Sequence, residues 1–166
     1  MAAADPVAGC WQIAVIGAGS CSVAVAEQAC QVGRLLAAAG QVLICGGLGG
    51  VMAAAARGAR ENGGITIGIV PGSDRGQANP YIDYEIVSNL GHGRNFLIIH
   101  SADGVIALPG SDGTLAEIAI SRKLGKPLVA VGSCWEFLPA VNCFPTPEKA
   151  VATLLSILPR HVPDEK

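Results

Sequence analysis

Charged residues are scarce in this sequence of 166 amino acids. Asp, Glu, Lys and Arg make up 14% of the chain, whereas globular domains average about 25%. The 11 basic and 13 acidic side chains give a formal net charge of −2. The chain therefore lacks the basic surface that holds a nucleic-acid backbone, and we expect no nucleic-acid partner.

The sequence also lacks an uninterrupted apolar run of the roughly 18–20 residues that a membrane-spanning helix needs. Its first residues, 1–11, contain Asp5 and Pro6 and do not have the pattern of a signal peptide. The six cysteines form no C-x-x-C pair and show no zinc-ligand spacing, which favours buried free thiols in a reducing compartment. These absences predict a cytoplasmic protein with no membrane partner.

Apolar residues and glycine are abundant instead. Hydrophobic residues make up 51% of the chain and there are 22 glycines, a composition that excludes a disordered protein. The length suits a single domain, which we place at 1–166 with its core at about 12–158. Because few charges are available to cover the outside, we expect apolar surface, including an alanine-rich helix over 51–62, to meet another subunit of a homo-oligomer.

Short apolar runs alternate with longer helical segments, which is typical of a parallel sheet covered by helices. The irregular stretch 71–83 is long for a loop in a compact domain and is a candidate lid, and 163–166 is expected to be a solvated tail. The fold class is α/β, with one doubly wound domain and a mostly parallel sheet flanked by helices. Strands are predicted at 12–17, 41–45, 65–70, 84–87, 104–108 and 127–131, and helices at 21–39, 51–62, 93–101, 114–124 and 147–158.

Three of the predicted strands end in glycine-rich turns that lead into helices. In an open parallel sheet, ligands bind beyond the carboxyl ends of the strands, and helix N-termini attract anions. A tight strand-to-helix connection is enough to explain any one of these turns, but the three together predict a cradle for a small phosphate-bearing ligand. Their predicted binding residues are Gly17, Gly19 and Ser20 in the first turn, Gly46, Gly47, Gly49 and Gly50 in the second, and Gly110, Ser111, Asp112, Gly113 and Thr114 in the third.

None of the common nucleotide-binding motifs is complete. The first turn begins like a dinucleotide fingerprint, but Ser22 stands at the third glycine position and the second strand ends in Cys45 instead of an acidic residue. No glycine turn continues into Lys-Ser or Lys-Thr, so the phosphate loop of P-loop proteins is absent. There is no Gly-x-Ser-x-Gly elbow, and the three histidines lack metal-ligand spacing. We therefore expect no catalytic metal site.

Four segments occur together in an order that resembles a known family. They are Gly46-Gly-Leu-Gly-Gly-Val-Met52, Gly63-Gly-Ile-Thr-Ile-Gly-Ile-Val-Pro-Gly72, Arg94-Asn95, and Leu108-Pro-Gly-Ser-Asp-Gly-Thr-Leu-Ala-Glu117. The chain is similar to the Rossmann-like superfamily that holds the Lonely Guy phosphoribohydrolases, and within it to the molybdenum cofactor carriers of green algae. An Ala-Asn-Pro-Tyr segment supports the second likeness and adds Asn79 to the predicted binding residues. The resemblance also adds Arg94, Asn95 and Glu117 to them.

The resemblance to the carriers implies a homotetramer whose cargo is the molybdenum cofactor, a pterin with a terminal phosphate and a dithiolene-held molybdenum. Such a protein protects the cofactor from oxidation and delivers it to apo-molybdoenzymes such as nitrate reductase. The resemblance to the hydrolases implies an alternative, in which a nucleoside 5′-monophosphate is split into free base and ribose 5-phosphate. A nucleotide-binding module without turnover is a third interpretation.

In the hydrolases an Arg and the motif Glu are catalytic, and these positions are Arg94 and Glu117 here. Hydrolases usually carry Arg-Lys and Pro-Gly-Gly-x-Gly-Thr, whereas this chain has Asn95 after the Arg and Ser-Asp within the turn. These departures favour a binding protein over an enzyme. Arg94 suits two-point binding of a phosphate, and Glu117 suits stabilisation of an oxocarbenium-like centre. Simpler interpretations are a solvated cation for Arg94 and a capping box for Thr114-x-x-Glu117.

Overall fold

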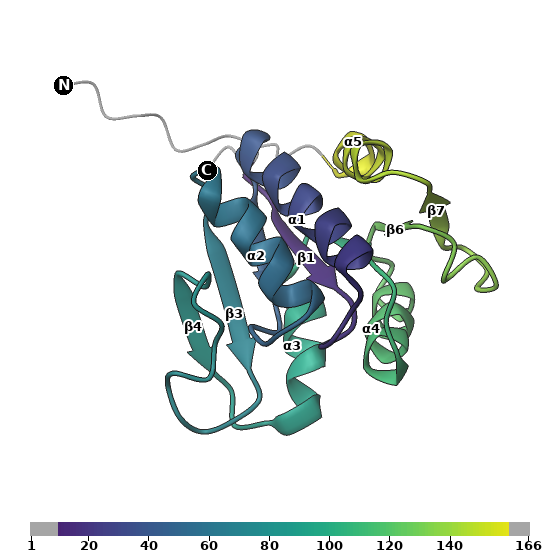
Figure 1. Ribbon diagram of the computed structural model, residues 1–166. Coiled ribbons are helices and arrows are strands. Elements are labelled where there is room, and N and C mark those ends of the chain that lie inside the picture. Colours follow the sequence, from purple (N-terminus) through teal and green to yellow (C-terminus); the bar gives the residue numbers. More distant parts are fainter. Residues whose placement is uncertain (1–9, 160–166) are drawn as a thin grey trace, which may run out of the picture.

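A parallel sheet forms the centre of the protein, which a computed structural model describes over residues 10–159 (Figure 1). The predictions about the first residues of the chain and about the tail at 163–166 therefore fall largely or wholly outside the described part. Within that part, seven strands lie in the order β4-β3-β2-β1-β5-β6-β7. They are β1 (Gln12–Ile16), β2 (Val42–Cys45), β3 (Thr66–Val70), β4 (Tyr84–Val87), β5 (Gly104–Ala107), β6 (Leu128–Val131) and β7 (Asn142–Phe144).

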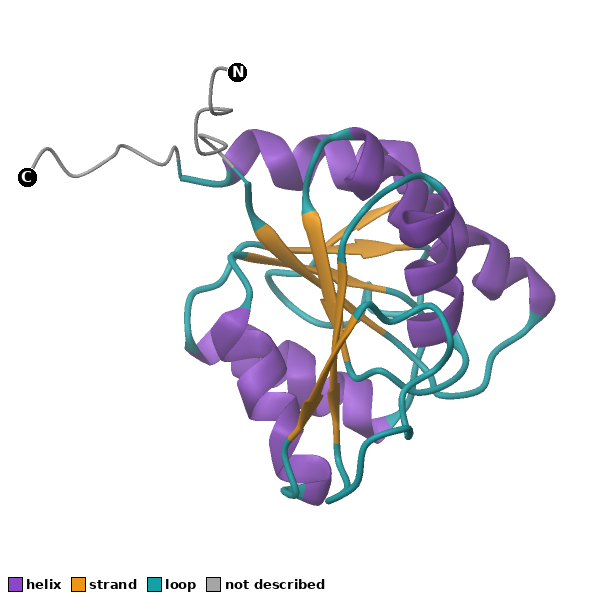
Figure 2. Ribbon diagram, turned by 90° about the vertical axis from the view of Figure 1, so that its left-hand side faces the viewer, coloured by secondary structure: helices purple, strands orange, loops and turns teal. Residues whose placement is uncertain are grey.

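Helices cover both faces of this sheet (Figure 2). One apolar cluster joins α1, α2 and α5 to the sheet, and a second joins α3 and α4 to the opposite face. In β1, Ile13 and Val15 enter the first cluster while Ala14 and Ile16 enter the second, which explains why the central strands are apolar throughout. The helices are α1 (Val23–Ala38), α2 (Val51–Glu61), α3 (Arg94–Ser101), α4 (Asp112–Lys123) and α5 (Pro147–Ile157), with a 3₁₀ turn, η1 (Gly91–Gly93), before α3.

The sheet changes its direction of growth between β1 and β5. From β1 the chain adds β2, β3 and β4 on one side, and it then returns to place β5, β6 and β7 on the other. All neighbouring strands pair in parallel. This confirms the doubly wound α/β prediction, and it opens a crevice at the carboxyl ends of β1 and β5, where such folds bind ligands.

The alanine-rich helix α2 packs closely against α1. A Cβ atom on Gly33 would lie 2.0 Å from the carbonyl oxygen of Ala55, and one on Gly58 would lie 1.9 Å from that of Cys30. The two glycines therefore allow the helix backbones to approach, and the apolar face of α2 is buried within the chain. This burial leaves little of the apolar face of α2 for another subunit, and the contact of this helix with a second subunit stays a prediction. The most exposed large apolar side chains include Val23, Tyr84 and Phe137 instead.

Three further details differ from the sequence-based expectations. Strand β7 was not predicted, and α4 begins at Asp112, two residues earlier than expected. Of the six free cysteines, Cys30 and Cys45 are buried, whereas Cys134 is exposed and the other three are half-buried. The expectation of buried thiols is therefore correct for two positions. No helix within residues 10–159 has the length and apolar character of a membrane span.

Candidate ligand-binding site

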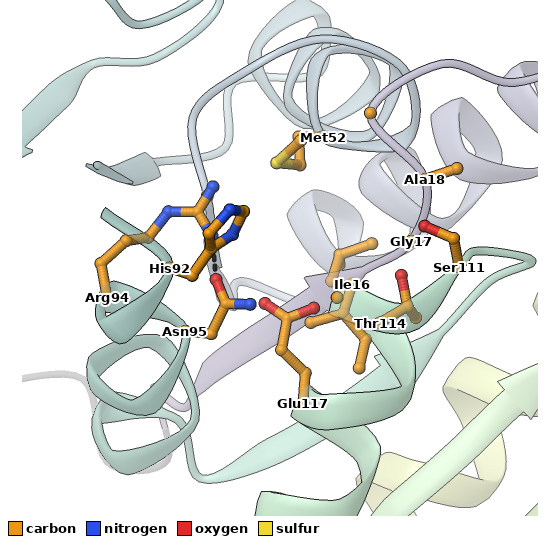
Figure 3. A pocket seen from close by; sticks show the side chains of 14 residues that line it. Ile16, Gly17, Ala18, Met52, His92, Arg94, Asn95, Ser111, Thr114 and Glu117 are labelled. Atoms are coloured by element: carbon orange, nitrogen blue, oxygen red, sulfur yellow. Dashed lines mark hydrogen bonds between the residues drawn. The ribbon is translucent and has the colours of Figure 1, made fainter. Parts of the chain in front are cut away.

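The three glycine turns meet at the crevice between β1 and β5. The N–H of Ala18 in the first turn donates to the carbonyl oxygen of Pro109 in the third (3.1 Å), and the N–H of Val51 after the second turn donates to the carbonyl oxygen of Ala18 (2.9 Å). Together the turns surround a cavity of about 180 Å³ (Figure 3). The geometry thus places the three turns at one cavity, and the binding of a phosphate there stays a prediction.

The cavity brings together nine of the sixteen predicted binding residues. These nine are Gly17, Gly19, Gly46, Arg94, Asn95, Ser111, Gly113, Thr114 and Glu117. The lining also includes five residues that were not predicted, namely Val15, Ile16, Ala18, Met52 and His92. The remaining seven predicted residues lie outside this lining. Ser20 and Gly110 line a neighbouring hollow, and Asp112 lines a groove between α3 and α4. Gly47, Gly49 and Gly50 form the rest of the second turn, to which Asn79 is hydrogen-bonded.

Arg94, the first residue of α3, is buried with 9% of its surface exposed. Its guanidinium lies against the second turn, where a Cβ atom on Gly46 would be 2.6 Å from Nη2. Nη1 donates to Oδ1 of Asn95, whereas Nε is buried without a hydrogen-bond partner in the described structure. Burial lowers the pKa of Arg94, against the opposite effect of Glu117. The interpretation of Arg94 as a solvated cation is therefore wrong.

Glu117 projects into the cavity from α4 (Figure 3). It is 7% exposed, and burial raises the pKa of its carboxyl to about 7, although the nearby charge of Arg94 acts in the opposite direction. Within residues 10–159 this carboxylate has no hydrogen-bond or ion-pair partner, and the ion pair that the structure does form joins Arg60 to Asp83. The Glu117 carboxylate and the Arg94 guanidinium therefore influence each other's pKa but do not form an ion pair.

The capping-box interpretation of Thr114 and Glu117 is also wrong. Ser111 is the N-cap of α4, so both residues lie inside the helix. The Ser111 side chain makes no capping hydrogen bond, and the first N–H groups of an α-helix have no intrahelical acceptor. At Gly110, a Cβ atom would be 2.1 Å from Oγ1 of Thr114. Glycine thus lets the turn approach the helix and leaves donors at the cavity for an anion.

The side chain of Asn79 is hydrogen-bonded to the second turn. Its Nδ2 donates to the carbonyl oxygens of Gly47 (3.1 Å) and Leu48 (2.8 Å), and its backbone N–H donates to Gly47 as well. The loop 71–83 that carries Asn79 is itself anchored by Glu85 of β4, whose carboxylate accepts three backbone N–H groups from residues 76–78. Asn79 therefore positions the turn, and the loop is tied to the sheet.

Cys45, at the end of β2, is fully buried and does not line the cavity. Burial raises the pKa of its thiol to about 11, and the Gly47 N–H that donates to Sγ offsets part of this increase. The thiol is thus held in its neutral form within the core. Among the described residues, His, Cys, Asp and Glu side chains form no group of three that would hold a metal ion.

The sequence pattern of the SLOG cluster4 family matches residues 10–154, which is nearly all of the described chain. The chain belongs to the SLOG cluster4 family. An uncharacterized protein from Archaeoglobus fulgidus is 42% identical over 145 residues, which are 87% of this chain and 95% of that protein. The cytokinin riboside 5′-monophosphate phosphoribohydrolase of Mycobacterium tuberculosis is 37% identical over 123 residues, or 71% of this chain and 65% of that enzyme.

Solved structures resemble this SLOG cluster4 protein almost from end to end. The molybdenum cofactor binding protein of Rippkaea orientalis superposes with a TM-score of 0.82 and 32% identity, covering 89% of this chain and 96% of that chain. The molybdenum cofactor carrier protein of Chlamydomonas reinhardtii has a TM-score of 0.81 and 31% identity, covering 90% and 98%. These findings confirm the resemblance to the cofactor carriers within the Lonely Guy superfamily.

A more distant likeness concerns the fold alone. DNA processing protein A of Helicobacter pylori has a TM-score of 0.72 at 20% identity, covering 90% of this SLOG cluster4 chain and 81% of that chain. Its single-stranded DNA binding is a property of that protein. This likeness therefore shows the fold alone.

Proposed function

We propose that this protein binds the molybdenum cofactor as cargo, protects it, and delivers it to apo-molybdoenzymes such as nitrate reductase. The observation that carries the proposal is a buried Arg94 that lines a cavity which also receives the N-terminus of α4. A guanidinium at the cavity and the N–H groups at the start of the helix both attract a phosphate oxygen. The similarity to two molybdenum cofactor proteins supports this particular phosphate-bearing cargo.

Within the proposal, different residues of the cavity make different contacts with the cofactor. The N–H groups around Gly113 and Thr114 and the guanidinium of Arg94 hold the terminal phosphate. Asn95 keeps Arg94 in place through its Oδ1. Because Asn95 already accepts from one guanidinium nitrogen, fewer donors remain for the ligand, which suits a cargo that must be released. When bound, the cofactor supplies the molybdenum chemistry of the recipient enzyme, and the carrier performs none.

Transfer to a cofactor-free enzyme tests this function. We expect protein loaded with the cofactor to restore activity when it is mixed with cofactor-free nitrate reductase. An Arg94→Ala variant should retain less cofactor and restore less activity, whereas Lys123→Ala, which removes an exposed cation from the other end of α4, serves as the matched control. Failure of the intact protein to retain the cofactor and to restore activity would contradict the proposal.

A second candidate function is hydrolysis of nucleoside 5′-monophosphates to free base and ribose 5-phosphate. It is favoured by the unpartnered carboxylate of Glu117 in the cavity and by the similarity to the mycobacterial phosphoribohydrolase. An ionised Glu117 would stabilise the positive charge that develops on the ribose as the N-glycosidic bond breaks, while Arg94 holds the phosphate. The raised pKa of Glu117 then requires a pH above about 7 for full activity.

Product analysis separates the alternatives. Incubation with AMP or with cytokinin riboside monophosphates should release free base if the protein is a hydrolase, and Glu117→Ala should release none. If the intact protein releases no base, the hydrolase function is excluded. A nucleotide-binding module without turnover predicts a co-purified nucleotide instead of the cofactor, and mass spectrometry of the bound ligand distinguishes the three functions.

The proposal includes the homotetramer implied by the resemblance to the carriers and the cytoplasmic location predicted from the cysteine spacing. Exposed apolar side chains support assembly: Tyr84 and Ile86 on β4 and Phe137 in the β6–β7 loop are each between 47% and 70% exposed. Apolar residues exposed in this way often contact another subunit. Light scattering on the purified protein should give four times the mass of the chain, and a monomeric mass would contradict the assembly.

A further inference from the structure

The cavity is too small for the whole of the proposed cargo. Its volume is about 180 Å³, whereas pockets for cofactor-sized ligands span roughly 300–1,000 Å³. A phosphate with part of its linker fills such a space, and the ring system must lie elsewhere. Two openings lead out of the cavity, and their chemistry differs.

The first opening is a groove of about 510 Å³ between α3 and α4. It shares His92, Asn95 and Gly113 with the cavity, so the two spaces are continuous. Figure 3 shows His92 and Arg94 among the side chains around the cavity, and His92 also lines the groove. The rest of the groove is lined chiefly by Phe96, Ala116 and Ile120, with Asp112 as its acidic side chain. The groove is thus apolar and aromatic, with one carboxylate.

The second opening is a hollow of about 460 Å³ between the first and third glycine turns. Its lining includes the hydroxyl groups of Ser20, Ser22 and Ser111, together with the half-buried Cys21. Ser22 is the N-cap of α1, and its Oγ accepts from the N–H of Val25. This lining suits small polar groups and offers no aromatic surface. A flat heterocycle therefore fits the first opening better.

We propose that the groove between α3 and α4 receives the ring system of the ligand whose phosphate lies in the cavity, and that Asp112 recognises a guanine-like edge of that ring. The inference rests on the proposed function, because a pterin carries such an edge. There an amino group and a ring N–H stand side by side, and both donate hydrogen bonds. An ionised carboxylate has two acceptor oxygens and matches this pair.

The position of Asp112 fits this role electrostatically. Asp112 lines the groove but does not line the cavity, so its negative charge stands outside the space assigned to the phosphate. Asn95 lies in both linings, and because its Oδ1 is occupied by Arg94, its Nδ2 is left to donate to a ring carbonyl. Donors and acceptors are thus placed for a ring that carries a carbonyl next to its N–H.

Nucleotide binding tests the recognition of this edge. GMP presents the same amino and N–H pair as a pterin, whereas AMP lacks it. Calorimetric titration of the intact protein should show that GMP binds about tenfold more tightly than AMP or better, since a bidentate contact discriminates by at least that order. Asp112→Asn replaces one acceptor oxygen by a donor and should abolish the preference. Equal affinities in the intact protein, or an undiminished preference in Asp112→Asn, would overturn the proposal.

Blocking variants test the place of the ring. Ala116→Trp fills the groove and should weaken GMP binding at least tenfold, whereas Ala119→Trp, an exposed position on the same helix outside the groove, should not. Thermal melting verifies that both variants fold. If Cys21→Trp weakens GMP binding and Ala116→Trp does not, the ring lies in the second opening and the proposal is wrong.

Cofactor retention separates this inference from the proposed function. If Ala116→Trp retains the molybdenum cofactor as well as the intact protein does, the function stands and the groove assignment fails. If the intact protein retains no cofactor but prefers GMP in an Asp112-dependent way, the groove assignment stands and the cargo is different.

Discussion

At the scale of single residues, the buried polar side chains gather at the ligand site. Six polar or charged side chains are buried in the described structure, and four of them, Arg94, Asn95, Thr114 and Glu117, line the cavity. Buried polar groups without partners destabilise a fold. Their concentration around one cavity therefore marks it as the candidate ligand site.

Glu117 should make the free energy of unfolding depend on pH. Its pKa is about 7 in the folded protein and 4.5 in its unperturbed state. The folded protein holds this proton more tightly, so stability decreases as pH rises from about 4.5 to about 7. Urea unfolding should give a free energy about 2–3 kcal/mol lower at pH 8 than at pH 5, and Glu117→Gln should remove that difference. An equal pH dependence in both proteins would contradict the assignment.

Gly46→Ala should reduce ligand binding while preserving the fold. The new Cβ would lie 2.6 Å from Nη2 of Arg94 and 2.7 Å from Sδ of Met52, and both atoms lie near the ends of long side chains that can move away. We expect the affinity for inorganic phosphate to fall about tenfold, the loss of one charge-assisted contact, with a change in unfolding free energy below about 1 kcal/mol. Calorimetry and urea unfolding measure the two quantities.

Gly50→Ala is the contrasting variant for that experiment. Gly50 has φ +59°, and its Cβ would lie 2.3 Å from the backbone carbonyl oxygen of Ala18, which cannot move without distorting the turn. This substitution should destabilise the fold by about 2 kcal/mol or more. If Gly46→Ala is as destabilising as Gly50→Ala, the second turn is more rigid around Arg94 than we infer.

At the scale of elements, the sequence predicts the helices and strands that have a clear pattern of apolar residues within their own segment. The central strands were found because continuous apolar runs are typical of strands covered on both faces. Strand β7 was missed because Asn142–Phe144 is a short edge strand without such a run. The burial of Arg94 and the approach of His92 to the cavity depend on η1 and α3 packing beside the second turn. No pattern along the chain encodes that contact.

The loop 71–83 gives a prediction at the same scale. Glu85 accepts hydrogen bonds from the N–H groups of Gly76, Gln77 and Ala78, and these bonds lower the pKa of its carboxyl. Glu85→Gln places an NH₂ donor among these N–H groups and should release the loop. Trypsin should then cleave faster after the exposed Arg75.

Glu61→Gln, an exposed position at the end of α2, is the control for this cleavage. Unchanged cleavage after Arg75 in Glu85→Gln would show that the other contacts of the loop are sufficient to hold it. The interpretation of the loop as a lid adds a further expectation, that bound ligand slows the cleavage in the intact protein. Equal rates with and without ligand would indicate a passive loop.

At the scale of the whole molecule, two features of the fold explain why the chain has few charged residues. The sheet is apolar on both faces, and α1 and α2 meet through small residues, so much of the apolar excess is internal. The glycine turns present backbone N–H groups where other proteins use basic side chains to hold an anion. One of the few cations, Arg94, is buried at the cavity, and the chain keeps it there at a cost in stability.

This cost predicts that function and stability oppose each other at Arg94. At pH 6, where Glu117 is mostly protonated, Arg94→Leu should melt at least as high as the intact protein, because it removes a buried and incompletely paired charge. Inorganic phosphate at 100 times its Kd should stabilise the intact protein by about 2.7 kcal/mol, raising Tm by about 5–10 °C. Arg94→Leu should lose this increase, and Arg122→Leu, which removes an exposed cation from α4, should keep it. A lower Tm for Arg94→Leu in the absence of phosphate would mean that Arg94 stabilises the ligand-free fold. It would contradict the inference that Arg94 is kept for anion binding at the expense of stability.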